Sequence, residues 1–365
     1  MPKKIFIIAG EASGDLHGSN LVLALKGLSP DTIFSGMGGP LMLKAGVRSF
    51  QDISELSVIG LGEVLSSLEK FKSVFRMLVE KLEEEKPDCV ILIDYPEFNL
   101  RFAREAKERG IPVIYYISPQ IWAWRRGRVK IIKRFVDKMI VILGFEKDFY
   151  AKYGVSAEFV GNPLLDSVRT LCPRDEFLRQ HGMDISKKTV AILPGSRRGE
   201  IEKNLPVMAE AAEMIKGKLG GGVQFMVAKF GGEYNIYDCM NAADVVLVAS
   251  GTATLEAAIL EKPMIVVYRV SFLTWLFGKL LVRIPFIGLV NIVAGEKVVP
   301  EFVGFRVEPG KIADEAVSIL LSPSRSKSIK TRLAAIKGKL GMPGASKRAA
   351  EIIKNSIRLE ARPGG

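Results

Sequence analysis

Short apolar runs alternate with amphipathic stretches along the first part of the chain. The apolar runs lie between turn or charged residues, at Lys4–Ala9, Asp88–Ile93, Pro112–Ile117, Lys138–Leu143 and Glu158–Val160. Helical patterns fall between them, as at Leu100–Arg109 and Arg128–Val136. Continuous apolar runs of this length are typical of strands buried on both faces. Their alternation with helices predicts a doubly wound parallel sheet.

A second series of strand-like runs follows in the other half of the chain. Its members are Thr189–Leu193, Val223–Ala228, Asp244–Ala249 and Met264–Tyr268. We place the break between the two series near Asn162–Pro173, so the sequence predicts an α/β protein with two parallel sheets in tandem. The predicted domains are residues 1–168 and 169–344. A helical pattern at Ala345–Arg358, within residues 345–365, is expected to pack back on the first domain.

One connection in the second series is short. Only 15 residues, Lys229 to Ala243, separate two predicted strands. That length leaves room for a single short helix.

The length and composition fit two folded domains in a reducing compartment. The chain has 365 residues, of which 48% are hydrophobic and 25% charged, the balance of a globular protein. Its three cysteines are far apart and form no CxxC pair, which argues against a disulfide framework or a zinc site. The N-terminus lacks the usual form of a signal peptide. We therefore expect a cytoplasmic protein.

A net charge of +12 suggests an anionic partner. The sequence lacks the motifs with aromatic residues that are typical of RNA- and DNA-binding proteins, so no nucleic-acid partner is predicted. Anionic lipid or a phosphorylated substrate would be attracted by the same field. A solvated basic surface remains the alternative.

Two segments are unusually apolar without being long enough to span a membrane. Leu56–Leu68 leads into a helical pattern that carries several cations, and Phe272–Val293 is interrupted by Lys279, Arg283 and Pro285. Apolar bulk with interspersed cations suits a segment that lies among anionic headgroups. The alternative is that both segments are core helices.

The stretch Ala9–Gly18 follows the first strand directly and reads AGEASGDLHG. Glycines let such a loop approach a ligand, and the N–H groups of the next helix point at whatever binds. The stretch is not GxGxxG, so NAD binding is disfavoured. Ser13 and Gly14 are candidate ligand-binding residues, and Glu11 and Asp15 are candidate catalytic carboxylates. A plain turn from strand to helix is the alternative.

Asp94 follows a buried strand and precedes Tyr95 and Pro96. A carboxylate at the carboxyl end of such a strand is well placed to take a proton from a substrate hydroxyl. The chain has only two histidines, His17 and His181, so carboxylates are the better candidates for a general base. Capping of the following helix is the structural alternative.

The stretch Ser118–Arg126 reads SPQIWAWRR and also follows a strand. Two tryptophans and two arginines on a loop are costly unless something binds there. Tryptophan faces suit sugar rings and acyl chains, and arginine suits phosphate. The candidate substrate-binding residues here are Gln120, Trp122, Trp124 and Arg125.

Two small-residue turns in the second series suggest a nucleotide-sugar site. Leu193–Glu200 reads LPGSRRGE and Ser250–Glu256 reads SGTATLE. Backbone N–H groups at the helix starts, together with arginine, can hold a diphosphate, and an acid can bind ribose hydroxyls. The candidate residues are Gly195, Ser196, Arg197, Glu200, Ser250, Gly251, Thr252, Ala253, Thr254 and Glu256.

Taken together and in order, these motifs resemble the lipid-A-disaccharide synthases, a family of the glycosyltransferase-B architecture. The resemblance is carried by AGEASGDLHG, IDYPEFN, SPQIWAWR, GNPL, LPGSRRGEI and SGTATLEA, followed by Asn291. It covers nearly the whole chain. It implies two Rossmann-like doubly wound domains that face a cleft, and it adds Asn291 to the donor-binding residues.

The resemblance also implies a reaction and its partners. The C-terminal domain would hold UDP-2,3-diacylglucosamine and the N-terminal domain 2,3-diacylglucosamine 1-phosphate. The acceptor 6-hydroxyl would attack the anomeric carbon with inversion, which gives a β-1,6 disaccharide and UDP. No metal and no cofactor are expected. The lipid substrates place the chain at the cytoplasmic face of the inner membrane, and whether it forms a homodimer stays open.

The chain departs from the family pattern in its short Lys229–Ala243 connection. The family usually has a longer stretch there, which helps to form the pocket for the uracil base. Two other functions remain as alternatives. One is another UDP-sugar enzyme of the same architecture, such as a cell-wall glucosamine transferase or an epimerase. The other is a lipid-binding homologue without full catalysis.

Overall fold

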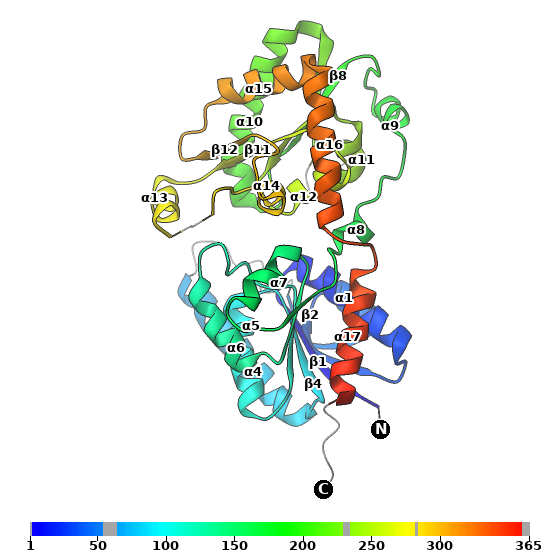
Figure 1. Cartoon of the computed structure of the whole chain (residues 1–365), viewed down its shortest axis with the longest axis vertical. Helices are drawn as coiled ribbons and strands as arrows, with labels where there is room; N and C mark the ends of the chain where they lie inside the picture. Colours follow the sequence, from blue (N-terminus) through cyan, green and yellow to red (C-terminus); the bar gives the residue numbers. More distant parts are fainter. Residues whose placement is uncertain (1, 54–63, 229–233, 282–283, 360–365) are drawn as a thin grey trace. The chain divides into compact units, whose positions relative to one another are not determined.

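The chain folds into two compact units, which we describe from a computed structural model (Figure 1). The described residues are 2–53, 64–228, 234–281 and 284–359. Unit 1 comprises Met1–Pro163 and Met342–Gly365, and unit 2 comprises Leu164–Gly341. These limits differ by a few residues from the boundaries set from the sequence.

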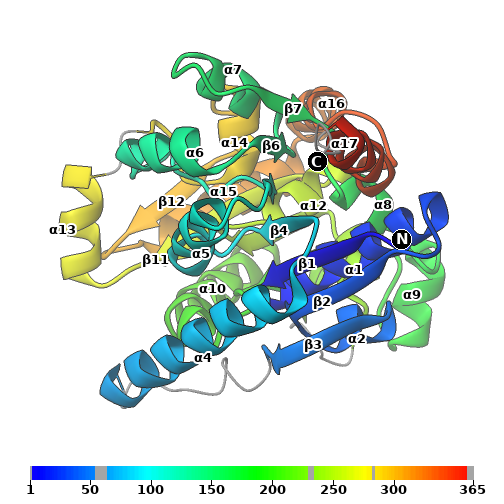
Figure 2. The same ribbon diagram turned by 90° about the horizontal axis from the view of Figure 1, so that it is seen from below.

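Unit 1 contains a seven-stranded sheet in which every neighbouring pair is parallel. Figure 2 shows several of its strands side by side. The spatial order is β3 (Val47–Asp52), β2 (Ile33–Gly38), β1 (Lys4–Ala9), β4 (Cys89–Ile93), β5 (Val113–Tyr116), β6 (Lys138–Val141) and β7 (Ala157–Phe159).

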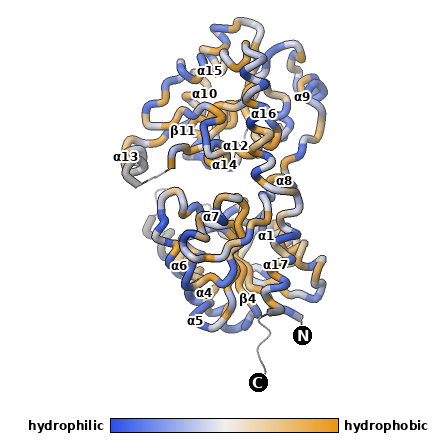
Figure 3. Tube along the Cα trace, in the orientation of Figure 1, coloured by the Kyte–Doolittle hydropathy of each residue, from blue (hydrophilic) through white to orange (hydrophobic). Residues whose placement is uncertain are grey.

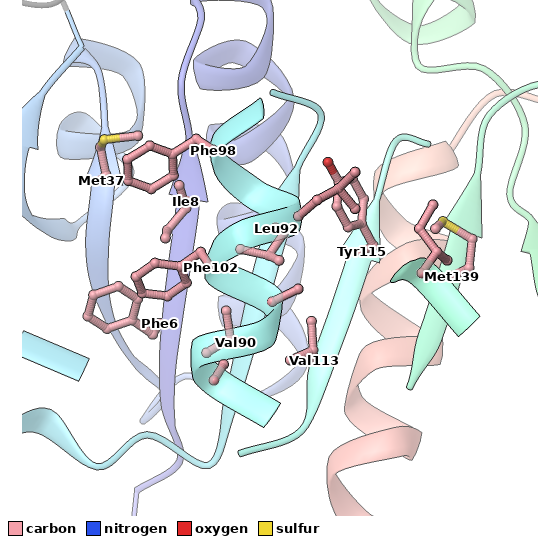
Figure 4. Packing of buried hydrophobic residues seen from close by; sticks show 14 of the residues in the cluster. Phe6, Ile8, Met37, Val90, Leu92, Phe98, Phe102, Val113, Tyr115 and Met139 are labelled. Atoms are coloured by element: carbon pink, nitrogen blue, oxygen red, sulfur yellow. The ribbon is translucent and has the colours of Figure 1, made fainter. Parts of the chain in front are cut away.

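Helices cover both faces of this sheet because alternate residues of each strand point to opposite faces. Phe6 and Ile8 of β1 enter one core (Figure 4), whereas Ile5 and Ile7 enter the other. The first core is closed by α4 (Val64–Glu85), α5 (Pro96–Glu108) and α6 (Val129–Phe135), and the second by α1 (Ala12–Leu28) and α17 (Ala345–Leu359). Two shorter helices, α2 (Pro40–Lys44) and α7 (Gly144–Ala151), also belong to the unit.

The last helix, α17, lies along α1, which begins only a few residues after the first strand (Figure 1). Lys354 Nζ donates to the carbonyl of Leu28 at 2.8 Å, and Arg348 Nε donates to the carbonyl of Val160 at 2.8 Å. Its buried residues Ala349 and Ile353 belong to the second core. Helix α17 is therefore part of unit 1.

Unit 2 contains a five-stranded parallel sheet. Its order is β12 (Glu301–Gly304), β11 (Met264–Arg269), β10 (Val245–Ala249), β8 (Lys188–Leu193) and β9 (Val223–Val227). Its helices are α8 (Leu164–Ser167), α9 (Arg174–Gln180), α10 (Arg198–Leu219), α11 (Ile236–Ala242), α12 (Ala253–Ile259), α13 (Phe272–Leu281), α14 (Leu289–Ala294), α15 (Pro309–Leu321) and α16 (Pro323–Lys339). In each unit the hydrophobic strands lie inside (Figure 3).

The predicted fold class is confirmed, with two parallel α/β sheets. Three strands were not predicted, namely β2, β3 and β12. The sequence of β2, IFSGMG, contains small and polar residues, and β3 and β12 are edge strands with charged residues, so none shows a continuous apolar run. Between β9 and β10 the described residues hold one short helix, α11, as the length of that connection predicts.

The two apolar segments differ in how far the structure describes them. Most of Leu56–Leu68 lies outside the described residues, and α4 begins at Val64. In the other segment, α13 exposes Phe272, Leu273 and Leu276. No helix within the described parts of the chain is long and apolar enough to cross a membrane.

Candidate active site

The loops after β1 and β4 touch one another at the carboxyl edge of the unit 1 sheet. The ring of Tyr95 lies against Gly10, where an added Cβ would be only 2.1 Å from Tyr95 Cδ1. Burial and the charge of Glu11 raise the pKa of Tyr95, so this carboxylate is also near the ring. The structure thus brings Glu11 to the loop that carries Asp94.

Asp94 is held in an unusual backbone conformation. It and Tyr95 are consecutive non-glycine residues in the left-handed region, with φ of 44° and 46°. Such residues cost about 1–3 kcal/mol each and cluster at functional sites. The Asp94 carbonyl accepts hydrogen bonds from Asn99 Nδ2 at 2.8 Å and from the Tyr115 hydroxyl at 2.5 Å, and its N–H donates to the carbonyl of Tyr116 at 3.2 Å. The half-buried carboxyl group therefore projects from a fixed backbone.

Asp15 has a different environment. Its buried carboxylate accepts three backbone N–H groups, from Gly39 at 2.9 Å, Leu41 at 3.0 Å and Met42 at 2.9 Å. These donors are at the start of α2, so Asp15 caps that helix from α1. Three backbone donors already occupy this carboxylate, so the arrangement favours a positioning role over that of the base.

The first turn of α1 lies beside these acids. Glu11 occupies the N-cap position and its carbonyl accepts the first helical bond, from Asp15 N at 2.9 Å. Ser13 is exposed and Gly14 is buried against Ala9. On the same helix, burial lowers the pKa of His17 to about 4, so this imidazole is neutral at physiological pH.

The structure places Trp122 in the interior rather than on the surface that the sequence analysis expects. Its Nε1 donates to Glu146 Oε1 at 3.1 Å, and its ring meets Phe145 edge-on. Burial raises the pKa of Glu146 to about 8. Ser118 Oγ lies 2.7 Å from the Tyr150 hydroxyl. These buried groups anchor the loop to α7, a contact that the one-dimensional pattern did not predict.

Of the candidate residues on the same loop, Gln120 and Trp124 are exposed and Arg125 is half-buried. The guanidinium of Arg125 lies 4.1 Å from the centroid of the Trp124 ring. Arg125 also forms an ion pair with Glu97, which Arg128 shares at 2.6 Å. An indole with one ion-paired arginine beside it is therefore available at the surface.

In unit 2 the first small-residue turn leads from β8 into α10. Gly195 has a φ of 129°, and a Cβ there would lie 2.8 Å from Glu200 Cβ, so only glycine fits. Glu200 Oε2 lies 3.4 Å from Ser196 N and 3.5 Å from Arg197 N. Both distances are at the weak limit for hydrogen bonds. Ser196 and Arg197 are exposed at the start of this 22-residue helix.

The second turn runs from β10 into α12. Ser250 Oγ donates to the carbonyl of Ile287 at 3.0 Å, and Thr254 Oγ1 donates to the carbonyl of Gly251 at 2.8 Å. Thr252 is exposed, and Ala253 is the first residue of α12.

Glu256, on α12, faces the helix of the short connection. The hydroxyl of Tyr237 lies 3.4 Å from Glu256 Oε1. Burial raises the pKa of Glu256, and the hydrogen bond from Tyr237 opposes that rise. Burial and the charge of Glu256 raise the pKa of Tyr237 to about 12. Tyr237 is thus a neutral hydrogen-bond donor to this carboxyl group.

Asn291 is buried, and its amide is fully used inside unit 2. Nδ2 donates to the Val299 carbonyl and to Glu301 Oε1, both at 2.8 Å, and Oδ1 accepts from Val298 N at 2.8 Å and Val299 N at 3.0 Å. An amide has two donors and two acceptor positions, so the arrangement favours a positioning role over direct contact with the donor.

Asn204 is another residue with a buried side-chain amide, and the sequence analysis did not predict a role for it. Its Nδ2 donates to the Pro194 carbonyl at 3.0 Å and its Oδ1 accepts from Arg269 N at 2.8 Å. It thereby ties α10 to the ends of β8 and β11. Across the described residues no three His, Cys, Asp or Glu side chains are grouped closely enough to hold a metal ion.

Comparison with known proteins identifies the family. The family model for lipid-A-disaccharide synthetase matches residues 5–234 and 223–355. The lipid-A-disaccharide synthase of Syntrophus aciditrophicus is 47% identical over 377 residues, covering 98% of each chain. That of Geobacter sulfurreducens is 42% identical over 369 residues, covering 96% of each chain. The two matched stretches of the family model overlap at residues 223–234, which include the start of the short connection.

Solved structures share the fold at low sequence identity. The UDP-GlcNAc 2-epimerase of Neisseria meningitidis bound to UDP-GlcNAc gives a TM-score of 0.67 at 15% identity, covering 96% of this chain and 100% of that chain. The calicheamicin glycosyltransferase CalG4 gives 0.58 at 12% identity, covering 99% and 100%. With the family match, these findings show that the chain belongs to the lipid-A-disaccharide synthase family, enzymes that make the lipid A disaccharide by glycosyl transfer.

Proposed function

We propose that the chain transfers 2,3-diacylglucosamine from its UDP derivative to the 6-hydroxyl of 2,3-diacylglucosamine 1-phosphate. The product is a β-1,6-linked disaccharide 1-phosphate, formed with inversion, and UDP is released. The observation that carries this proposal is Asp94, a carboxyl group on a strained and hydrogen-bonded backbone at the end of β4. Family membership supports the overall reaction.

In the proposed step, the Asp94 carboxylate takes the proton of the acceptor 6-hydroxyl. The oxygen then forms a bond to the anomeric carbon of the donor. The bond from that carbon to the diphosphate oxygen breaks, and UDP leaves with the electron pair. Glu11 is the second candidate for the base because it lies on the adjoining loop. Asp15 is proposed to position that loop by capping α2.

For the donor, we propose a site on unit 2. The exposed first turn of α10 offers Ser196 and Arg197 to the diphosphate, since helix N-termini and arginine both favour phosphate. A phosphate there would replace the two long contacts of Glu200. The turn that contains Ser250 and Thr252 would add further donors, and Glu256 would bind the ribose hydroxyls. The fold shared with a UDP-GlcNAc-bound epimerase supports a UDP-sugar donor.

For the acceptor, we propose a site on unit 1. The first turn of α1, with Ser13 and Gly14, offers N–H groups to the 1-phosphate. The exposed residues Gln120 and Trp124 and the half-buried Arg125 would contact the sugar or its acyl chains. Trp122 would act indirectly, by fixing their loop. Both substrates are lipids, so we propose that the enzyme works on the anionic cytoplasmic face of the inner membrane.

The test uses purified protein, both acylated substrates and detergent, with EDTA present. Released UDP and the disaccharide are measured by mass spectrometry. We expect Asp94→Asn to lower turnover by about 10³-fold or more while UDP still binds. Asp88→Asn is the matched control. Asp88 directly precedes the first residue of β4, whereas Asp94 directly follows the last. Full turnover in Asp94→Asn would remove Asp94 from the mechanism.

A further inference from the structure

Unit 2 has a partly exposed aromatic cluster formed by residues of α13, whose place is labelled in Figure 1, and the residue that follows β12. Phe305 meets Phe272 at a centroid distance of 5.2 Å and Trp275 at 4.8 Å, and the rings of Phe272 and Trp275 are 6.1 Å apart. The cluster is only partly covered. Phe272 is 53% exposed, and its neighbours on α13, Leu273 and Leu276, are 64% and 40% exposed. Exposed apolar groups that adjoin one another mark binding surfaces.

Cations border this apolar surface. A pocket of about 370 Å³ is lined by Phe272 and Phe305 together with Lys203 and Arg269. Both cationic residues are exposed. Arg306 lies 5.5 Å from the centroid of Phe305.

The acid in the pocket lining is already paired. Glu202 forms an ion pair with Arg198 at 2.8 Å, so its charge is compensated. The balance of charge around the aromatic cluster is therefore positive.

We propose that this surface, which we call the α13 surface and define as Phe272, Leu273, Leu276, Lys203 and Arg269, docks on an anionic phospholipid bilayer. The apolar side chains would enter the headgroup region while the two cations meet lipid phosphates. Charge complementarity selects this occupant, because a purely apolar partner would leave Lys203 and Arg269 uncompensated. The proposal rests on the proposed function only in that the substrates lie in a membrane.

Docking can be measured without substrates or turnover. Cys172 is first replaced by serine. The Leu273→Cys substitution then introduces a cysteine on the α13 surface, and this cysteine is labelled with an environment-sensitive fluorophore. The other two cysteines, Cys89 and Cys239, are fully buried and shielded from the reagent. The matched control is Leu321→Cys on α15, because Leu321 has the same 64% exposure as Leu273.

With vesicles that contain phosphatidylglycerol, we expect the emission of the probe at position 273 to increase and shift to the blue. The probe at position 321 should not respond, and neither probe should respond to phosphatidylcholine vesicles. The double variant Phe272→Ser/Leu276→Ser should raise the lipid concentration needed for a half-maximal response of the probe at position 273 by about tenfold. Lys203→Gln and Arg269→Gln should each raise that lipid concentration about fivefold.

Three results would overturn the proposal. One is no response at 273 while flotation shows that the protein is bound to the vesicles. Another is equal responses at 273 and 321. The third is a response at 273 to monomeric acylated glucosamine 1-phosphate without vesicles, which would assign the surface to substrate acyl chains. Failure of the proposed transferase reaction would leave the vesicle response unchanged, so the two proposals fail separately.

Discussion

Trp122 Nε1 donates a hydrogen bond to Glu146 Oε1 over 3.1 Å, and both side chains are buried in unit 1. The backbone N–H of Leu143 also donates to this carboxyl group, at 3.2 Å. Because the pKa of Glu146 is raised to about 8, the group is mostly protonated at neutral pH. The loop that carries Gln120, Trp124 and Arg125 is therefore anchored to an acid whose charge state changes with pH.

This anchor predicts a specific loss of stability as the pH rises from acid to slightly above neutral. A carboxyl group whose folded-state pKa is raised contributes stability that is complete below its unfolded pKa and is lost as the pH rises through the folded value. From the raised pKa of Glu146, the window runs from roughly pH 4.5 to about 8. Within it the free energy of unfolding should fall by up to about 1.4 kcal/mol per pH unit.

Glu146→Gln should remove that part of the pH dependence, because glutamine does not titrate. Urea unfolding of both proteins across this pH range is the measurement. If the two stability curves run parallel, Glu146 does not titrate as proposed.

Gly10→Ala should disturb the site without touching a charged group. The new Cβ would overlap the Tyr95 ring, which lies next to Asp94, so the ring or the loop must move. We expect turnover to fall at least tenfold and the free energy of unfolding to fall by about 1–3 kcal/mol. Gly27→Ala on α1 is the control, because nothing lies within 4 Å of its new Cβ. Equal activity in the two variants would contradict the contact between the loops.

Asp15→Ala tests whether this acid is structural. Removal of its carboxylate leaves three N–H groups at the start of α2 without their acceptor. We expect the free energy of unfolding to fall by about 1–3 kcal/mol, measured by chemical denaturation. A variant of unchanged stability that has lost turnover would return Asp15 to the candidate bases.

Tyr237→Phe tests the support of Glu256 from the short connection. Loss of the hydroxyl removes one hydrogen bond to the proposed ribose ligand. We expect the Kd for UDP to rise about fivefold, equivalent to roughly 1 kcal/mol, measured by calorimetry. Tyr234→Phe is the control, because its ring packs against His181 and Phe177 and needs no hydroxyl for that contact. If UDP binding weakens equally in both variants, the effect is not specific to Glu256.

The sequence predicts the sheet best where the strand is buried on both faces. Strands β1, β4 and β8, none of which is an edge strand, contain continuous apolar runs and match the predicted ranges to within one residue. Strand β2 does not, because Gly36 lies so close to β1 that a Cβ would overlap the carbonyl of Ile7. A small residue is needed there, and a small residue weakens the apolar pattern.

Individual residues of the site were harder to predict for a different reason. Trp122 appears in a loop rich in arginine, and only its pairing with Glu146, 24 residues later, shows that it is buried. Asn291 belongs to a recognisable motif, yet its partners at 298–301 show that its amide is already used. Local spacing identifies which loops lie at the end of a sheet. Local spacing does not reveal which side chains of these loops already form hydrogen bonds within the protein that fix the loop conformation.

The position of α17 also affects how the chain is made. On the ribosome the residues of unit 2 emerge before α17, so the second core of unit 1 stays open until α17 has been synthesised. Until then Leu21, Val22 and their neighbours on α1 lack the cover of Ala349 and Ile353. Unit 2 has all its elements first and can fold first. A recombinant version of unit 1 would therefore need residues 342–359 joined back to it, whereas unit 2 is one continuous segment.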